Sequence, residues 1–270
     1  MARQTAELMG DEAARAGLAA DEFDREWVAG HLATERRHAG LLGEIREIVF
    51  GAQDGLVSTL AVVSLVAGAT PERLPILIAG IASALAGIFS MAAGEYTSSK
   101  SQREIFEAQI AGEREEVAER PGEAEAEVTF MLEEEGLPRD DAVRVARIMA
   151  GHPEVMLKTM VEKELGLPVE EGHGHGSPLQ GAMIMGVAFG MGAAVPLLPY
   201  ILLPVNGGAT VTSFVATAGV LFGIGVVKSR WTRRNWFHSG IEILLLGAFA
   251  GLAGFFFGSV LPQLLGAPSV

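Results

Sequence analysis

Five apolar stretches, each long enough to cross a bilayer as a helix, alternate with polar segments along the chain. About 20 apolar residues are needed for such a helix, and the stretches that qualify are residues 48–69, 74–95, 179–203, 208–228 and 241–262. Only the residues ATPER link the first two, and the prolines there predict an antiparallel hairpin of helices. The pattern predicts an all-α, polytopic membrane protein with five transmembrane helices.

The long polar interval between the second and third apolar stretches has the pattern of several short helices. The second span is expected to continue as a helix to Pro121-Gly122, and three helices should follow at about 123–135, 139–150 and 154–165. Each of them ends at a glycine or proline, where helices commonly stop. The predicted organisation is an N-terminal arm, two spans, an inserted helical domain and three further spans, at residues 1–47, 48–96, 97–178 and 179–270.

The acidic charge of the chain is concentrated in the inserted domain. Residues 97–178 hold 19 Asp and Glu against 9 Lys and Arg, and residues 1–47 hold 10 against 6, in a chain of net charge −13. Such a block repels nucleic acid and attracts cations. Cysteine is absent, which excludes disulfides, thiolate zinc sites and iron–sulfur clusters. Phosphate loops, nucleophile elbows, dinucleotide fingerprints and HExxH motifs are absent too, so no enzyme is expected.

Basic residues near the ends of the spans predict the orientation of the chain in the lipid bilayer. The loop between the fourth and fifth spans holds Lys228, Arg230, Arg233 and Arg234, and further arginines precede the first span. The positive-inside rule places both groups in the cytosol. The N-terminus and the 97–178 domain are then cytosolic, and the C-terminus lies outside. Residues 1–40 are charged and show no cleavable signal peptide, so the internal spans are expected to direct insertion.

Asp54 is a carboxylate within the first apolar span, and Met91 lies in the second. A charge at membrane depth costs a few kcal/mol or more, so it usually serves an ion, a proton or a partner. Both side chains should lie roughly 6–9 Å below the cytosolic surface, with Glu95 near that layer. A carboxylate beside a thioether suits Fe²⁺ better than Mg²⁺ or Ca²⁺. Alternatively, Met91 only fills the span, and Asp54 is a helix-start carboxylate that reaches the interface.

Glutamates with helical spacing in the inserted domain form a second candidate for metal binding. Glu113 and Glu116 share one helix face, and Glu123 and Glu127 are four residues apart on the next helix. An antiparallel hairpin at the 121–122 break would bring the two pairs face to face. The alternative is that these glutamate-rich helices are solvated faces that bind no ligand.

The last helix of the inserted domain adds a methionine to these candidates. Met160 and Glu164 are four residues apart and therefore share a face. Converging carboxylates without cysteine favour Fe²⁺, Mn²⁺, Co²⁺ or Zn²⁺, and methionine shifts the preference toward softer ions. Such ions are expected as substrate or ligand, and no tightly bound cofactor is expected.

The histidines point to metal chemistry only weakly. His173 and His175 lie in a polar linker and are interpreted as a solvated loop. The motif Glu35-x-x-His38 has the spacing of a di-iron carboxylate helix, but residues 1–47 cannot supply the four helices that such a site needs. We therefore expect residues 1–47 to form a cytosolic amphipathic arm.

Three stretches of the chain resemble the vacuolar iron transporter family. They are EIVFGAQDGLVSTLAVVSLVAGA in the first span, IAGIASALAGIFSMAAGEYTSSKSQRE in the second, and SGIEILLLGAFAGLAGFFFGSVLP in the last. The resemblance runs over Glu44–Leu261. It implies a homodimeric antiporter with five spans that moves Fe²⁺, and often Mn²⁺, out of the cytosol in exchange for protons. It also implies an ion path between the subunits and a cytosolic helical metal-binding domain between spans two and three.

Residues at the family's functional positions are largely present. By resemblance, Asp54 and Met91 match its intramembrane ion residues. Its cytosolic metal ligands are matched by Glu113, Glu116, Glu127, Met160 and Glu164, with Glu123 displaced by one position. The chain departs from the family pattern at three positions, which are Ala124 for a glutamate, Val161 for a methionine and Ser83 for an acidic residue of some relatives.

The sequence as a whole therefore predicts a proton-coupled exporter of Fe²⁺ and Mn²⁺. The expected location is a prokaryotic inner membrane, or the vacuolar membrane if the source is eukaryotic. Two alternatives remain open at this point. One is a membrane-anchored iron buffer or sensor, and the other is a ferroxidase without transport.

Overall fold

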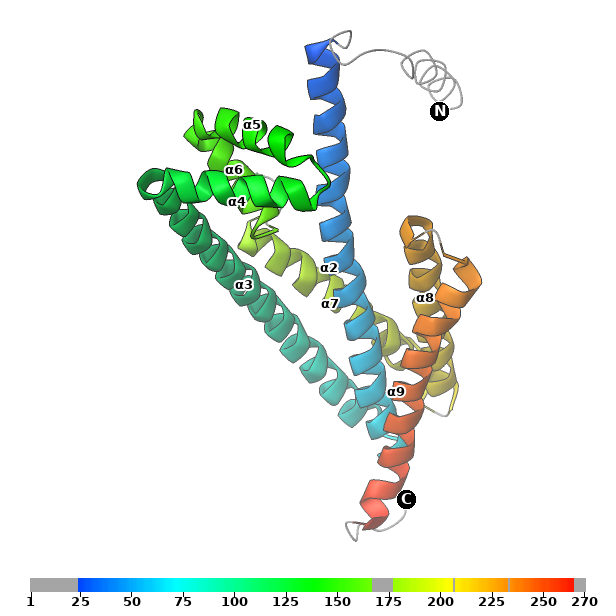
Figure 1. Cartoon of the computed structure of the whole chain (residues 1–270). Helices are drawn as coiled ribbons and strands as arrows, with labels where there is room; N and C mark the ends of the chain where they lie inside the picture. The colour runs from blue at the N-terminus through cyan, green and yellow to red at the C-terminus, as the bar shows by residue number, and fades with distance from the viewer. Residues whose placement is uncertain (1–23, 167–176, 206, 233, 265–270) are drawn as a thin grey trace. The chain divides into compact units, whose positions relative to one another are not determined.

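The computed structural model describes residues 24–166, 177–205, 207–232 and 234–264, and every regular element within these ranges is a helix (Figure 1). The helices are α2 (Arg25–Ala69), α3 (Arg73–Glu119), α4 (Pro121–Glu134), α5 (Arg139–Ala150), α6 (Pro153–Lys163), α7 (Pro178–Leu202), α8 (Gly208–Thr232) and α9 (Trp236–Leu264). The all-α prediction is confirmed. The linker histidines His173 and His175 lie outside the described residues.

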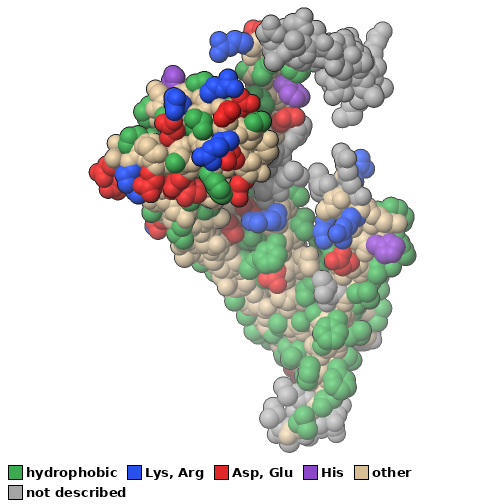
Figure 2. Space-filling model, viewed as in Figure 1, with side chains coloured by type: hydrophobic (Ala, Val, Ile, Leu, Met, Phe, Trp, Pro, Cys, Tyr) green, Lys and Arg blue, Asp and Glu red, His purple; other side chains and the backbone are tan. Residues whose placement is uncertain are grey.

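Five of these helices are long and apolar enough to cross a membrane, as predicted. The apolar segments are Ile45–Ala69 of α2, part of α3 (Arg73–Glu119), Pro178–Leu202, Gly208–Arg230 and Trp236–Val260. A helix of 25 residues is about 37 Å long, which is enough for the hydrocarbon core. Figure 2 shows hydrophobic side chains over these spans and many charged ones over α4, α5 and α6. The protein is therefore a multi-pass membrane protein.

Helix α3 joins the membrane segment to the acidic helices without a break. It has 47 residues, although its apolar part ends near residue 95. The remaining residues to Glu119 extend about 36 Å farther, which places α4–α6 well away from the apolar part of α3 (Figure 1). Pro121, the first residue of α4, ends this long helix because proline cannot donate the next helical hydrogen bond.

Helix α2 packs so closely on its neighbours that only glycine fits at several contacts. A Cβ atom on Gly55 would collide with the carbonyl oxygen of Phe189 in α7, and one on Gly258 in α9 would collide with that of Leu65. Such backbone contact maximises van der Waals packing in lipid, where no hydrophobic force drives helices together. Close backbone packing therefore holds the spans together, and only small shifts between them are sterically possible.

Helices α4, α5 and α6 share a small apolar core of their own. Its members are Ala124, Val128, Leu132, Ala142, Ala146, Met156 and Met160, which are all at most 9% exposed. Lys163 at the end of α6 donates to Glu135 at 2.6 Å and links α6 to the end of α4. The helix bounds agree with the sequence pattern to within two residues at each glycine or proline break.

The N-terminal part of α2 belongs to a separate structural unit, residues 1–43. Trp27 stacks on His31, with ring centroids 5.0 Å apart, and His31 lies 3.4 Å from Glu35. Val28 and Leu32 are more than one third exposed, so within this unit apolar side chains lie open to their surroundings. The side chain of His38 is not among those described.

Candidate metal centre

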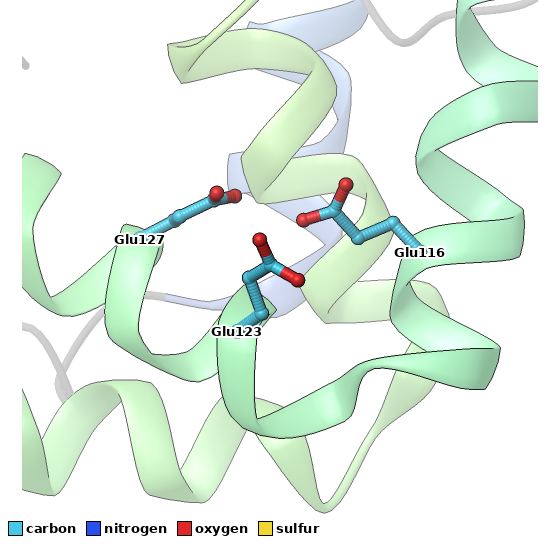
Figure 3. A group of neighbouring side chains, drawn as sticks. All are labelled: Glu116, Glu123 and Glu127. Atoms are coloured by element: carbon cyan, nitrogen blue, oxygen red, sulfur yellow. The ribbon is translucent and has the colours of Figure 1, made fainter.

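Three glutamates from two helices converge next to the break between α3 and α4. One oxygen each from Glu116, Glu123 and Glu127 lies within 4.8 Å of the others. Figure 3 shows Glu116 reaching across from α3 toward the other two, which point from successive turns of α4. The turn at Pro121 reverses the chain and brings the helix faces together, as the predicted hairpin requires. Carboxylates spaced in this way are able to share one divalent cation.

Arg120 holds two of the three carboxylates in place. Its guanidinium donates to Glu116 at 2.9 Å and to Glu123 at 2.7 Å. Since both of these carboxylates are paired with one cation already, an incoming metal ion would have to share them with Arg120 or displace it. The second oxygen of Glu116 is buried and has no hydrogen-bond partner among the described residues. That oxygen is therefore available as a ligand.

Glu127 is the carboxylate most strongly perturbed by its surroundings. Burial, followed by the negative charges of Glu116 and Glu164, raises the pKa of Glu127 to about 7 from an ordinary value of 4.5. Like charges that are held together disfavour ionisation. A divalent cation would remove the repulsion, so the cluster is arranged for a positive ligand.

Glu113 borders this cluster, and Met160 lies in the apolar core of the same helices. Burial and the charges of Glu164 and Glu116 raise the pKa of Glu113 on the extramembrane part of α3, and one of its oxygens is buried without a partner among the described residues. Met160 of α6 is fully buried in the α4–α6 core. The predicted ligands thus come from α3, α4 and the end of α6. Of the family departures, Ala124 also lies in this core, where it contributes packing and no oxygen.

Within the membrane, α7 lies between the helices that carry Asp54 and Met91. The backbone of Phe189 contacts α2 at Gly55, next to Asp54, and its ring fills the space beside Gly87 of α3, one turn from Met91. Nearer the link, α2 and α3 meet directly where Val63 approaches Gly80. The predicted hairpin is therefore open toward the Asp54 end. Both Asp54 and Met91 are half-buried in the single chain.

Glu95 has an acidic neighbour that the sequence reasoning missed. Oxygens of Glu95 and of Glu47 in α2 lie within 3.5 Å of one point, the position that a Cβ atom of Gly181 would take. The nearest oxygens of Glu47 and Glu95 are therefore separated by at most twice this 3.5 Å distance. Ser99 donates to Glu95 at 2.6 Å. The signal for Glu47 was present, because it precedes Asp54 by seven residues, or two helical turns on the same face.

These positions give three acidic levels on α2, α3 and α4. The outermost is the glutamate cluster near Pro121, the next is Glu47 with Glu95, and the deepest is Asp54. Oxygen ligands suit hard and borderline divalent ions, and a methionine at the deepest level adds a preference for borderline ones. The arrangement is chemically suited to collecting a divalent metal ion and moving it into the membrane.

The matching family model and three similar proteins all point to one family. A sequence model of the VIT family matches residues 45–259. The chain is 33% identical to vacuolar iron transporter 1 of Arabidopsis thaliana over 79% of its own length and 84% of the relative's. It is 32% identical to vacuolar iron transporter 2 of Oryza sativa subsp. japonica, with 78% and 85% covered. The vacuolar iron transporter of Plasmodium falciparum (isolate 3D7) is 29% identical, with 80% and 82% covered. These relatives are named as transporters, and the chain belongs to the VIT family of metal-transporting membrane proteins.

Proposed function

We propose that this protein exports Fe²⁺, and also Mn²⁺, from the cytosol in exchange for protons. The observation that carries the proposal is the three-glutamate cluster at the end of the same helix, α3, that forms the second span. A cation-binding site built directly onto a membrane helix is expected of a transporter that must gather a scarce ion. A protein with a purely structural role would not need it.

The proposed path starts at the cluster and descends along α2 and α3. Glu116 and Glu95 are 21 residues apart on one helix, or about 32 Å. An ion cannot be passed directly over that distance. The cluster therefore acts by raising the local concentration of metal near the mouth of the path. Glu47 and Glu95 then receive the ion, and Asp54 binds it within the membrane. Because α7 packs between α2 and α3 at this level, Met91 would take part only across the interface with a second copy.

Release to the far side is proposed to follow protonation of a carboxylate on the path. A proton and a metal ion compete for the same oxygen, so uptake of a proton from outside weakens the hold on the ion. The half-buried positions of Asp54 and Met91 leave one side of the site open in the single chain. We propose that a second copy completes it, in a homodimer whose N-terminus is cytosolic and whose C-terminus is outside.

The test is transport by the full chain in sealed proteoliposomes under anaerobic conditions. With an acidic interior, Fe²⁺ uptake should be faster than without a pH gradient, and the interior should become more alkaline as metal enters. Uptake that ignores the gradient would contradict proton coupling. Absence of uptake would contradict transport and favour the buffer or sensor. Oxygen-dependent oxidation of Fe²⁺ without uptake would favour the ferroxidase.

Replacing Glu127 by glutamine should strengthen the metal-free fold and weaken metal binding. The folded-state pKa of Glu127 is about 7, above its ordinary value of 4.5, so its contribution to stability falls as pH rises through this interval. Above pH 7 the full penalty is present, and a neutral glutamine avoids it. We expect a higher unfolding temperature at pH 8 without metal. Affinity for Mn²⁺, measured by calorimetry, should drop by at least about tenfold.

The exposed Glu134 on the same helix provides the control for this experiment. Glu134→Gln removes the same charge from α4 but lies outside the cluster, so both measurements should stay near wild type. Mn²⁺ affinity of the wild type should also decrease below pH 7 as Glu127 takes up a proton. Equal effects of Glu127→Gln and Glu134→Gln would show that the cluster has no special role.

Glu47→Gln should slow Fe²⁺ uptake by about tenfold while Mn²⁺ binding at the cluster is unchanged, since one charged contact of the path contributes about 1.5 kcal/mol or more. The double variant Glu47→Gln/Glu95→Gln tests whether the two carboxylates act together. Groups in contact give non-additive effects, so the double variant should be little slower than the slower single variant. Independent, additive losses would show that the two carboxylates do not act on the ion together, and a normal rate in Glu47→Gln would place Glu47 outside the path.

A further inference from the structure

The loop and helix ends between α8 and α9 form a basic, aromatic surface that the transport path does not use. Residues 179–270 contain four Lys and Arg, all within 228–234, and a single acid, Glu242. Figure 2 shows Lys and Arg side chains together at this end of α8 and α9. The rest of the chain is strongly acidic. The apolar spans on either side of this basic segment carry no charge except that of Glu242.

The bases of this surface have no acidic partner among the residues that the structure describes. Arg230 and Arg234 are exposed and Lys228 is partly so, and none of them forms an ion pair with a described carboxylate. In contrast, Arg103, Arg120 and Lys163 on the inserted helices are each paired with a glutamate. The unpaired guanidinium groups at 230 and 234 are therefore free to bind an external anion.

Three aromatic rings pack together beside these bases. Phe222, Trp236 and Phe237 meet edge to face, with centroids 5.7–6.3 Å apart. Trp236 is 57% exposed and Phe237 49%. Tryptophan and phenylalanine side chains half out of a protein, next to arginines at the end of two spans, fit the boundary between lipid headgroups and acyl chains.

The surface is rigid because α8 and α9 touch through their backbones. A Cβ atom on Gly225 would collide with the carbonyl oxygen of Ser239, and the ring of Phe222 lies directly against Gly240. Asn235 accepts a hydrogen bond from the backbone of Phe237 at 2.9 Å and fixes the start of α9. A preformed site loses less conformational entropy when a ligand binds.

We propose that this surface, defined by Lys228, Arg230, Arg234, Phe222, Trp236 and Phe237, binds the headgroup of an anionic phospholipid. Its phosphate would bind Arg230 and Arg234, and its acyl chains would pack on the exposed faces of Trp236 and Phe237. The membrane is the partner implied by the fold, because α8 ends and α9 begins at its surface. The proposal is independent of the metal that is transported.

The test compares full-length protein in nanodiscs that contain equal amounts of phosphatidylglycerol and phosphatidylcholine. Native mass spectrometry of the released protein gives the ratio of the two lipids that stay bound. Wild type should retain phosphatidylglycerol preferentially. Arg230→Gln/Arg234→Gln should reduce this preference by about 25-fold, since each base near a membrane surface contributes about fivefold.

Two matched variants separate this site from general charge effects. Arg230→Lys/Arg234→Lys keeps the charge and should keep most of the preference. Arg139→Gln/Lys158→Gln removes two exposed charges from the inserted helices and should keep all of it. Equal losses in the two glutamine variants would overturn the proposal, as would an unchanged ratio in Arg230→Gln/Arg234→Gln. If Arg230→Gln/Arg234→Gln loses the dimer while its lipid ratio stays unchanged, the proposal is also overturned. The surface would then be one that contacts the acidic helices of a second copy.

Discussion

Replacing Asp54 by asparagine should reduce Fe²⁺ uptake into proteoliposomes by about 100-fold or more, while Mn²⁺ binding at the glutamate cluster stays at the wild-type level. Removing one charge from a buried ionic contact costs about 3 to 5 kcal/mol, and asparagine offers the ion only a neutral oxygen. Because Asp54 is half-buried in α2, the substitution should leave the fold intact. Uptake and binding should be measured on the same preparation.

Glu72→Gln is the matched control for Asp54→Asn. Glu72 is exposed at the link between α2 and α3, and its neutralisation removes the same charge without touching the proposed path. Uptake by this variant should equal that of wild type. If Asp54→Asn transports normally, the path described above is wrong. If Asp54→Asn loses Mn²⁺ binding at the glutamate cluster as well as uptake, the substitution has damaged the protein as a whole. Asp54→Glu must then show restored Mn²⁺ binding for the proposed path to stand.

Gly55→Val should unfold or severely destabilise the membrane segment, by about 3 kcal/mol or more. The backbone of α7 at Phe189 occupies the space that the first carbon of any side chain at this position would need. Backbone atoms cannot move aside as a flexible side chain can, so α2 and α7 must separate along their length. The measurement is the fraction of folded, monodisperse protein during heating in detergent.

Gly219→Val provides the comparison, because a Cβ atom on Gly219 has no neighbour within 4 Å. It introduces the same β-branched side chain into an apolar span of similar length. Its unfolding temperature should remain within a few degrees of wild type. Comparable damage from both substitutions would show that valine in a span, and not the contact with Phe189, is responsible.

The helices and their ends were predictable because hydrophobic length and breaker residues determine them locally. Pro121 and the glycine and proline pairs that follow it end helices whatever the rest of the chain does. The convergence of Glu116 with Glu123 and Glu127 was also predictable, since a break between two amphipathic helices permits few other arrangements. These features depend on residues close together in the sequence.

The relation between distant helices was not predictable in the same way. A five-residue link suggests that α2 and α3 stay side by side, but α7 is inserted between them at the level of Asp54. The cause is Phe189 of α7. Its ring packs in the space beside Gly87, and its backbone packs in the space beside Gly55. Complementarity between residues more than 100 positions apart leaves no periodic signal. The pairing of Glu47 with Glu95 was missed because Glu95 lies on another helix, although the spacing of Glu47 from Asp54 could be read from the sequence.

The uninterrupted length of α3 makes it a lever. Its apolar part is anchored in the bilayer, and its outer part extends about 36 Å to the glutamate cluster. A change of 10° in the tilt of the span would move the cluster sideways by about 6 Å, more than the spacing of its own carboxylates. Bilayer thickness and the packing of α7 against α3 therefore help to determine where the cluster meets its ions.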